Sequence, residues 1–261
     1  MSALAIAAIV FACLFGTALL GLFLRTMLPE HHLSPESKDV VKLAMGLIAT
    51  MAALVLGLMT ASAKSSFDVQ NEETVRAAAN IMRLDRVLAR YGLETKETRD
   101  LLRQAVALRI HLTWPEDGSA PENLDSPEMT RAAEGVEDKI QELSPRNELQ
   151  REFKSRALQI SGDLLGTHWL RIAQSSNPVP LLFLVVLVFW LGILFGTFGL
   201  FAPHNTTVIV ALVLSAIAVA GSTFLILEMY RPFYGLMKIS PEPMRYALSQ
   251  LGRDLSPLSP P

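Results

Sequence analysis

Residues 43–68 read LAMGLIATMAALVLGLMTASAKSSFD, and this stretch decides the fold. Its first part, Leu43–Ala63, contains no Asp, Glu, Lys or Arg. A helix needs about 20 apolar residues to cross the ~30 Å hydrocarbon core of a bilayer. Because lipid offers no hydrogen-bonding partners, such a run is expected to be a helix, which pairs its own backbone groups. The stretch therefore predicts a transmembrane helix with Lys64 at one end.

Three further windows are free of charged residues: Leu4–Leu24, Val179–Phe201 and Thr206–Leu227. The four windows make up about a third of the 261 residues, and all of the charge lies outside them. The first window has no preceding basic residue and exceeds the ~7–15 apolar residues of a secretory signal, so we expect a permanent span. The pattern excludes a simple soluble domain and a disordered chain. A single cysteine excludes a disulfide scaffold.

The predicted architecture is an all-α membrane protein with four transmembrane helices and a helical cytoplasmic bundle between spans two and three. Apolar residues repeat at helical spacing throughout residues 64–178, and no useful stretch alternates as a strand does. The predicted divisions are 1–63 (spans one and two), 64–178 (cytoplasmic helices), 179–229 (spans three and four) and 230–261 (a tail with a short amphipathic helix).

Local signals predict where these helices begin and end. No Pro or Gly lies between Gly57 and Gly92, so span two is expected to continue into the first cytoplasmic helix. Trp114-Pro115 ends the next helix, and residues 115–125 are expected to form a loop. Three Ser-Pro pairs predict helix starts, at Ser126, Ser144 and Ser240. The segment 177–180 should interrupt the helix that precedes span three. Residues 256–261 are expected to be disordered.

Four spans place both termini on the same side as residues 64–178. Of the 23 Lys and Arg residues, 16 lie in that segment. Close to the spans, five basic residues on this side face three on the other, which favours a cytoplasmic location. We therefore expect a multi-pass protein of a bacterial inner membrane with cytoplasmic termini.

Little in the sequence predicts catalysis. It has no phosphate-binding loop of the Walker type, no cysteine cluster and no histidine pair one helical turn apart. His31 and His32 are adjacent, so their side chains diverge, and we interpret them as solvated loop residues; Cys13 is expected to be inert packing. The sequence predicts no enzyme, metal or cofactor. With a net charge of −2 and no basic stripe, it predicts no nucleic-acid partner either.

Small residues form a stripe on each span, which allows helix backbones to approach closely in lipid. Such stripes predict packing within the subunit, and four together also suggest packing between subunits. The absence of charge inside the windows argues against an ion-coupled pump, but not against a channel with an apolar constriction. The candidate helix-packing glycines are Gly46, Gly57, Gly192, Gly196 and Gly199.

Span two offers the best candidate path for ions. Its helical wheel suggests an apolar lining made by Met45, Ile48, Met51, Ala52, Val55 and Met59. Polar groups mark the expected pore mouths: Lys64, Ser65 and Ser66 at the inner end, and Asn205 and Thr206, which are expected to cap span four, on the far side. The alternative is that Lys64 only reaches from the membrane edge into water and pairs with Asp68, one turn away.

Residues 61–68 (ASAKSSFD), 84–92 (LDRVLARYG), 177–201 and 224–235 together resemble the bestrophin-like family of bacterial membrane proteins. The likeness extends from about residue 40 to 250. More distantly, Pro178–Leu181 and Arg231–Gly235 resemble elements of true bestrophins. That resemblance implies an oligomeric anion channel, with a pentamer as the family's assembly, four spans per subunit and an apolar neck lined by span two.

Two departures from true bestrophins matter. In true bestrophins, an acidic cluster that binds calcium follows the element that Arg231–Gly235 resembles. In this chain the non-acidic residues Leu236–Ile239 stand at that place, so calcium gating is not expected. The aromatic neck is also missing. The sequence thus predicts a homo-oligomer in the lipid bilayer that conducts small ions, with anions expected. The main alternative is a non-conducting scaffold or sensor whose cytoplasmic bundle binds a partner. A transporter and a membrane enzyme rank below both.

Overall fold

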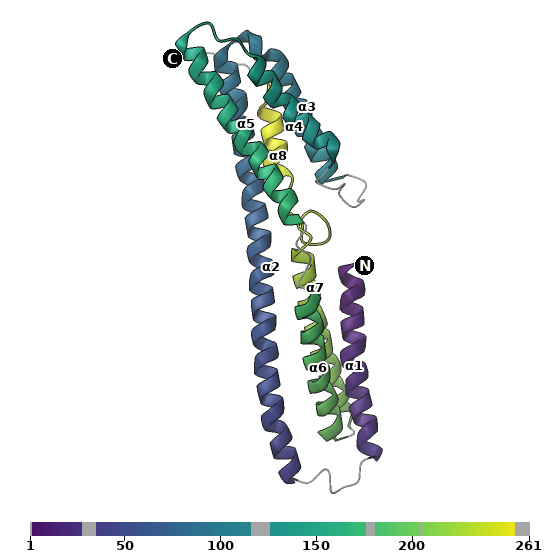
Figure 1. Ribbon diagram of the computed structural model, residues 1–261. Coiled ribbons are helices and arrows are strands. Elements are labelled where there is room, and N and C mark those ends of the chain that lie inside the picture. Colours follow the sequence, from purple (N-terminus) through teal and green to yellow (C-terminus); the bar gives the residue numbers. More distant parts are fainter. Residues whose placement is uncertain (1, 28–34, 116–125, 176–180, 204, 254–261) are drawn as a thin grey trace, which may run out of the picture. The chain divides into compact units, whose positions relative to one another are not determined.

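The computed structural model describes residues 2–27, 35–115, 126–175, 181–203 and 205–253 (Figure 1). Within these residues the regular structure is helical, and no strand is present. A short 3-10 helix, Leu93–Thr95, lies between the second and third α-helices. The α-helices are α1 (Ala3–Met27), α2 (Pro35–Tyr91), α3 (Lys96–Thr113), α4 (Pro127–Glu142), α5 (Glu148–Ser175), α6 (Leu181–Phe201), α7 (Thr206–Met229) and α8 (Glu242–Gln250).

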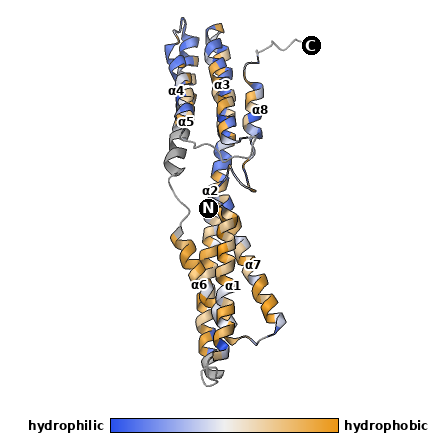
Figure 2. Ribbon diagram, turned by 90° about the vertical axis from the view of Figure 1, so that its right-hand side faces the viewer, coloured by the Kyte–Doolittle hydropathy of each residue, from blue (hydrophilic) through white to orange (hydrophobic). Residues whose placement is uncertain are grey.

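Four of these helices are long and apolar enough to cross a membrane: α1, α2, α6 and α7. In Figure 2, α1, α6 and α7 are predominantly hydrophobic, whereas α3, α4, α5 and α8 carry many hydrophilic residues. Each charge-free window of the sequence lies within one of the four helices apart from the first residues of the third window. The prediction of an all-α membrane protein with four spans is confirmed.

The chain forms two compact units. One comprises Met1–Phe67 and Pro178–Arg231, and the other comprises Asp68–Asn177 and Pro232–Pro261. Helix α2 contributes to both, because its 57 residues continue from the apolar window to Tyr91 without a break. This confirms the predicted continuation and makes α2 nearly three times as long as the ~20 residues that a span requires. Gly92, with a φ of 141°, follows the end of the helix.

The membrane unit has a core where α1, α6 and α7 meet. Leu14 and Ala18 of α1 are fully buried there, together with Phe195 of α6 and Ala216 of α7. At the end of α1, the Arg25 guanidinium donates a hydrogen bond to the Ala202 carbonyl just beyond α6. That carbonyl belongs to the last turn of a helix, where C=O groups lack partners within the helix. Arg25 thus satisfies one of them.

The second unit is a helical bundle with its own core. Leu84 and Leu88 of α2, Ile140 of α4 and Met244 of α8 are almost completely buried. Helices α3 and α4 are antiparallel neighbours. The ion pair between Glu97, at the start of α3, and Lys139, at the end of α4, measures 3.4 Å. Hydrogen bonding to Glu142 and the nearby charge of Glu97 raise the pKa of Lys139 above its usual value.

The predicted helix starts are only partly correct. Helix α4 begins at Pro127, as the sequence predicts, although the Ser126 side chain makes no capping hydrogen bond. The start predicted at Ser144-Pro145 is wrong, because α5 begins at Glu148. There the Asn147 side chain accepts the backbone N–H of Gln150 at 2.8 Å, the bond typical of an N-cap. The stop predicted at Trp114-Pro115 is confirmed, since α3 ends at Thr113.

Several sequence predictions fall outside the described residues. These are the interpretation of His31 and His32, the loop at 116–125, the break at 177–180 and the disorder expected for 256–261.

Candidate functional site

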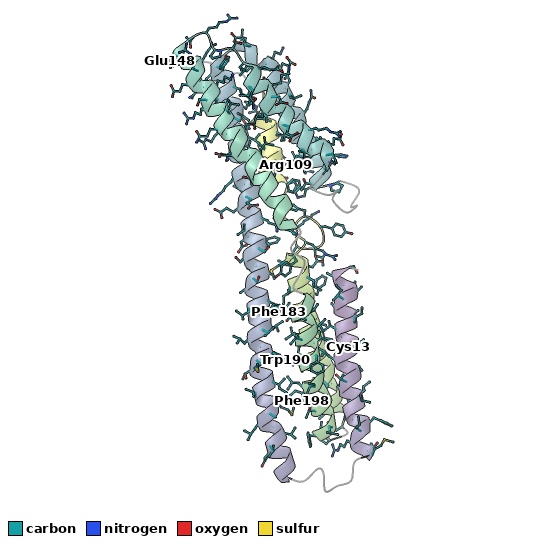
Figure 3. All side chains as sticks on the ribbon, in the orientation of Figure 1. Cys13, Arg109, Glu148, Phe183, Trp190 and Phe198 are labelled. Carbon is teal, nitrogen blue, oxygen red and sulfur yellow. The ribbon has the colours of Figure 1, made fainter. Side chains whose placement is uncertain are left out.

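One face of α2 packs inside the membrane unit. Ala52, Met59 and Ala63 are buried, with at most 5% of their surface exposed. They form a cluster with Leu184 and Leu187 of α6 and with Ile226 and Met229 of α7. Trp190 of α6, labelled in Figure 3, packs against the same cluster. This face of α2 therefore helps to hold the membrane unit together.

The predicted lining residues mostly occupy this inward face. Ala52 and Met59 are buried against α6 and α7, while Met45, Ile48 and Val55 are half-buried on the same stripe. Met51 differs, with 46% of its surface exposed. Of the predicted lining residues, Ala52, Val55 and Met59 thus pack against other helices of the same chain. The reason is that small and flexible side chains such as Ala52 and Met59 fit the close contact with α6 and α7.

A second face of the span is apolar and open. Leu47, Leu54 and Leu58 are 64%, 65% and 62% exposed, and Met51 lies between them on the same helical repeat. The repeat continues through Ala61 and Ser65, which are also exposed. This row of six residues, Leu47, Met51, Leu54, Leu58, Ala61 and Ser65, is called the open face of α2 below. It runs from the apolar window to the hydroxyl-rich end without a charged residue.

The C-terminal end of the span in α2 carries the polar groups that the sequence singled out. Lys64 and Ser65 are exposed, and Ser66 is half-buried. The Tyr230 hydroxyl, just beyond α7, donates a long hydrogen bond of 3.4 Å to Ser62. Glu228 lies one residue after the charge-free window and is 7% exposed, so the unit does hold a buried carboxyl group at this end.

The other predicted pore mouth lies at the start of α7. The side chain of Asn205 accepts the backbone N–H of Val208 at 2.8 Å, which confirms the predicted cap. Thr206 is exposed beside it. The first N–H groups of a helix and its macrodipole both favour negative charge nearby. This terminus can therefore attract an anion, although Asn205 itself already accepts a hydrogen bond.

The candidate glycines fall into two groups. A Cβ atom added to Gly199 would collide with the Ala18 carbonyl, and one added to Gly192 would lie 3.7 Å from Thr17. Gly196 also lies next to Thr17. A Cβ atom added to Gly21 of α1 would collide with the carbonyl of Gly196. Gly199 of α6 and Gly21 of α1 therefore let the two helices approach closely, whereas a Cβ at Gly192 or Gly196 would make ordinary contacts. Gly46 and Gly57 have no atom within 4 Å of such a position, so they lie on an open part of α2.

Other chemistry-bearing groups are sparse. Among the described residues, no cluster of three or more His, Cys, Asp or Glu is arranged to hold a metal. Cys13, labelled in Figure 3, is exposed on α1 and lines an open groove with residues of α6, so the packing expected for it is not seen within this chain.

The bundle contains a cavity of about 80 Å³ between α2, α3, α4 and α5. Its walls are mainly apolar and include Leu84, Leu102, Val106, Met129, Val136 and Leu164. The polar lining residues are Arg109 of α3 and Ser161 of α5.

Two crystal structures of single-substitution variants of a bacterial bestrophin homologue from Klebsiella pneumoniae resemble the whole chain. The first has a TM-score of 0.64 and 12% sequence identity, covering 95% of this chain and 99% of the homologue. The second has a TM-score of 0.60 and 14% identity, covering 97% and 99%. A crystal structure described as a membrane protein gives a TM-score of 0.56 at 14% identity, covering 94% and 99%.

At these identities the structural likeness concerns the fold alone. No curated protein matches the sequence. A family model, the bestrophin-like domain, matches residues 7–244, which includes all four spans and most of the bundle. That match agrees with the resemblance in residues 61–68 and 84–92 and with the four-span helical fold. The chain therefore belongs to the bestrophin-like family.

Proposed function

We propose that this protein is an ion channel, built from several copies of the chain around a common axis, with the open face of α2 along the path. Membership of the bestrophin-like family supports a channel of this type. The observation that carries the proposal is the open face itself. Four large apolar side chains, Leu47, Met51, Leu54 and Leu58, remain exposed on a span whose opposite face is packed.

This proposal revises the lining suggested by the helical wheel. Ala52 and Met59 stabilise the subunit from inside, so the path would be lined by Met51 together with Leu47, Leu54 and Leu58. A constriction of this kind can gate ion flow by dewetting. The same face continues through Ala61 and Ser65, whose small side chains would make the inner end of the ion path wider and more hydrated.

Anions are the proposed ions. Lys64 is exposed at the inner end of the span, and a ring of such groups from several copies would raise the local anion concentration. The start of α7, at Asn205 and Thr206, offers a second region favourable to negative charge. Leu236–Ile239 supplies no carboxylate, so the proposed channel is not opened by calcium through that element.

We place the protein in a bacterial inner membrane, with both termini and the bundle in the cytoplasm. The support is the excess of Lys and Arg near the spans on that side.

Thiol modification of the open face tests the channel directly. In a Cys13→Ser background, Leu54→Cys would be exposed to a charged, membrane-impermeant thiol reagent while anion flux is recorded in a planar bilayer. Modification at the lining position should block most of the current. Leu214→Cys on α7, with 62% exposure, is the matched control and should leave the current unchanged. Equal effects at both positions would remove α2 from the path.

A second function remains supported by the bundle, which has its own core and cavity. A non-conducting scaffold or sensor would use that bundle to bind a partner. Purified protein in liposomes distinguishes the two, because a scaffold gives no ion flux above that of empty vesicles.

A further inference from the structure

We propose that the cavity in the helical bundle binds a small aliphatic carboxylate of medium chain length, with its carboxylate on Arg109. This site lies within one unit of the chain and does not depend on whether the membrane unit conducts ions. The argument rests on the composition of the cavity wall, on its length and on the position of its cation.

The wall is suited to an alkyl chain. Leu102 and Val106 of α3 are about 95% buried, and they face Met129 and Val136 of α4, which are buried to a similar degree. Leu84 of α2 and Leu164 of α5 close the remaining sides. The apolar part of this wall offers water few hydrogen-bonding partners, so water there is poorly held. The wall does gain from an apolar occupant, as ligand pockets usually do.

The polar groups lie at opposite ends. Because α3 and α4 are antiparallel, Arg109 and Met129 share one end of the cavity, and Leu102 and Val136 share the other. At the second end the Ser161 hydroxyl, 4% exposed, donates a hydrogen bond of 3.4 Å to Glu137. That end therefore carries a carboxylate of the protein and disfavours an anionic ligand group. The first end carries a guanidinium.

Arg109 fits the carboxylate of a ligand in both charge and geometry. It lines the cavity and is half-buried, and in such surroundings a charge-assisted hydrogen bond is stronger than in water. A guanidinium has five N–H donors, so it can bind a ligand oxygen in addition to a partner within the protein. It also binds carboxylates through two parallel hydrogen bonds.

The length of the cavity sets the size of the ligand. Leu102 and Arg109 are seven residues apart on α3, which corresponds to about 10 Å along the helix axis at 1.5 Å per residue. An extended medium-chain carboxylate is about as long. Acetate would leave the apolar wall uncovered, whereas a long-chain lipid would exceed the cavity.

Octanoate is the probe for the test, with the full-length protein in lipid nanodiscs and empty nanodiscs subtracted to remove partitioning into lipid. Titration calorimetry should give saturable binding of octanoate, with 1-octanol and acetate at least tenfold weaker. Arg109→Gln should weaken octanoate binding about tenfold, as expected for loss of roughly 1.4 kcal/mol. It should leave the weak binding of octanol unchanged.

Two matched variants complete the test. Arg131→Gln, which removes an exposed arginine of α4 outside the cavity wall, should not alter binding. Ala133→Leu adds bulk to the wall and should abolish the binding of octanoate and octanol alike. If Arg109→Gln does not fold, Arg109→Lys replaces it and should retain a weakened preference for octanoate over octanol. Equal affinity in the wild type and Ala133→Leu, or no saturable binding at all, would overturn the proposal.

Discussion

The indole N–H of Trp114 donates a hydrogen bond of 2.8 Å to the backbone carbonyl of Ile239, 125 residues further along the chain. The Ile239 amide in turn donates to the Pro232 carbonyl at 2.7 Å. The Phe233 ring meets the indole edge-on, with 5.5 Å between ring centres. The segment 232–239 is thus fixed against the end of α3. It contains Pro232–Gly235, part of the element that resembles one in true bestrophins.

Replacing Trp114 with phenylalanine should loosen this segment. The ring remains, but the buried Ile239 carbonyl loses its donor, which costs about 1–3 kcal/mol. Urea unfolding of the purified protein would measure the loss, and limited proteolysis should show faster cleavage within 232–239. Tyr246→Phe removes a hydroxyl from an exposed ring of α8 and serves as control. Identical stability of the two variants would show that the indole bond contributes nothing.

Among the charged residues of the bundle, we expect substitution of Asp85, which pairs with Arg99, to lower the free energy of unfolding most. Asp85 is 1% exposed and accepts hydrogen bonds of 2.8 and 3.3 Å from the Arg99 guanidinium. Asp85→Ala leaves that guanidinium largely buried without its carboxylate, so a loss of about 3–5 kcal/mol is expected.

A surface pair provides the comparison for Asp85. Arg151 and Glu148 lie 2.6 Å apart, but their side chains are 63% and 86% exposed. Glu148→Ala should therefore cost less than about 1 kcal/mol. Denaturant unfolding of both variants measures the contrast, and similar losses would mean that the burial of Asp85 is energetically unimportant.

The spans were predictable because lipid imposes a requirement that the sequence must meet locally. Charge-free windows of sufficient length correspond to α1, the apolar part of α2, α6 and α7. The continuation of α2 was predictable for a similar reason, since neither Pro nor Gly interrupts residues 58–91. Both predictions use interactions within one segment.

Which face of α2 packs against α6 and α7 was not predictable from the sequence. A span is apolar all round, so hydropathy does not separate Ala52 and Met59, which are buried, from Leu54 and Leu58, which are exposed. Only the shapes of α6 and α7 decide which face packs. The start of α5 was predictable in principle. Asn147 and Gln150 have the spacing of a capping box, and the Gln150 side chain accepts the Arg146 N–H at 2.8 Å.

The close approach of α1 and α6 predicts an unusual sensitivity to a single methyl group. Gly199→Ala would place a Cβ against the Ala18 carbonyl and the Leu22 amide, which are backbone groups that cannot rotate away. Helix propensity alone would favour alanine by about 1 kcal/mol. Thermal unfolding in detergent should instead show a lower midpoint. Gly16→Ala, on an open part of α1, should raise the midpoint or leave it unchanged.

The proposed topology can be tested with reporter fusions. Alkaline phosphatase, active only outside the cytoplasm, should be inactive when fused after residue 253, and green fluorescent protein at the same site should fluoresce. A fusion within residues 28–34 should show the opposite pattern. Active phosphatase at the C-terminus would invert the proposed orientation and would place Lys64 on the outer side.

The charge of Lys64 provides the most direct test of ion selectivity. If copies of α2 surround an ion path, Lys64→Glu replaces each positive charge at the inner mouth with a negative one. A change of about 1 kcal/mol in the energy of a passing ion would lower the anion-to-cation permeability ratio about fivefold. The reversal potential under a salt gradient in a planar bilayer measures this ratio.

Salt dependence separates an effect of charge from one of shape. The Debye length falls from about 10 Å at 0.1 M salt to about 3 Å at 1 M, so the change in Lys64→Glu should shrink as salt increases. Lys96→Glu makes the same charge change on α3, in the bundle, and should leave the reversal potential near that of the wild type. An unchanged reversal potential in Lys64→Glu at low salt would exclude this lysine from selectivity and favour its role as an anchor at the membrane edge.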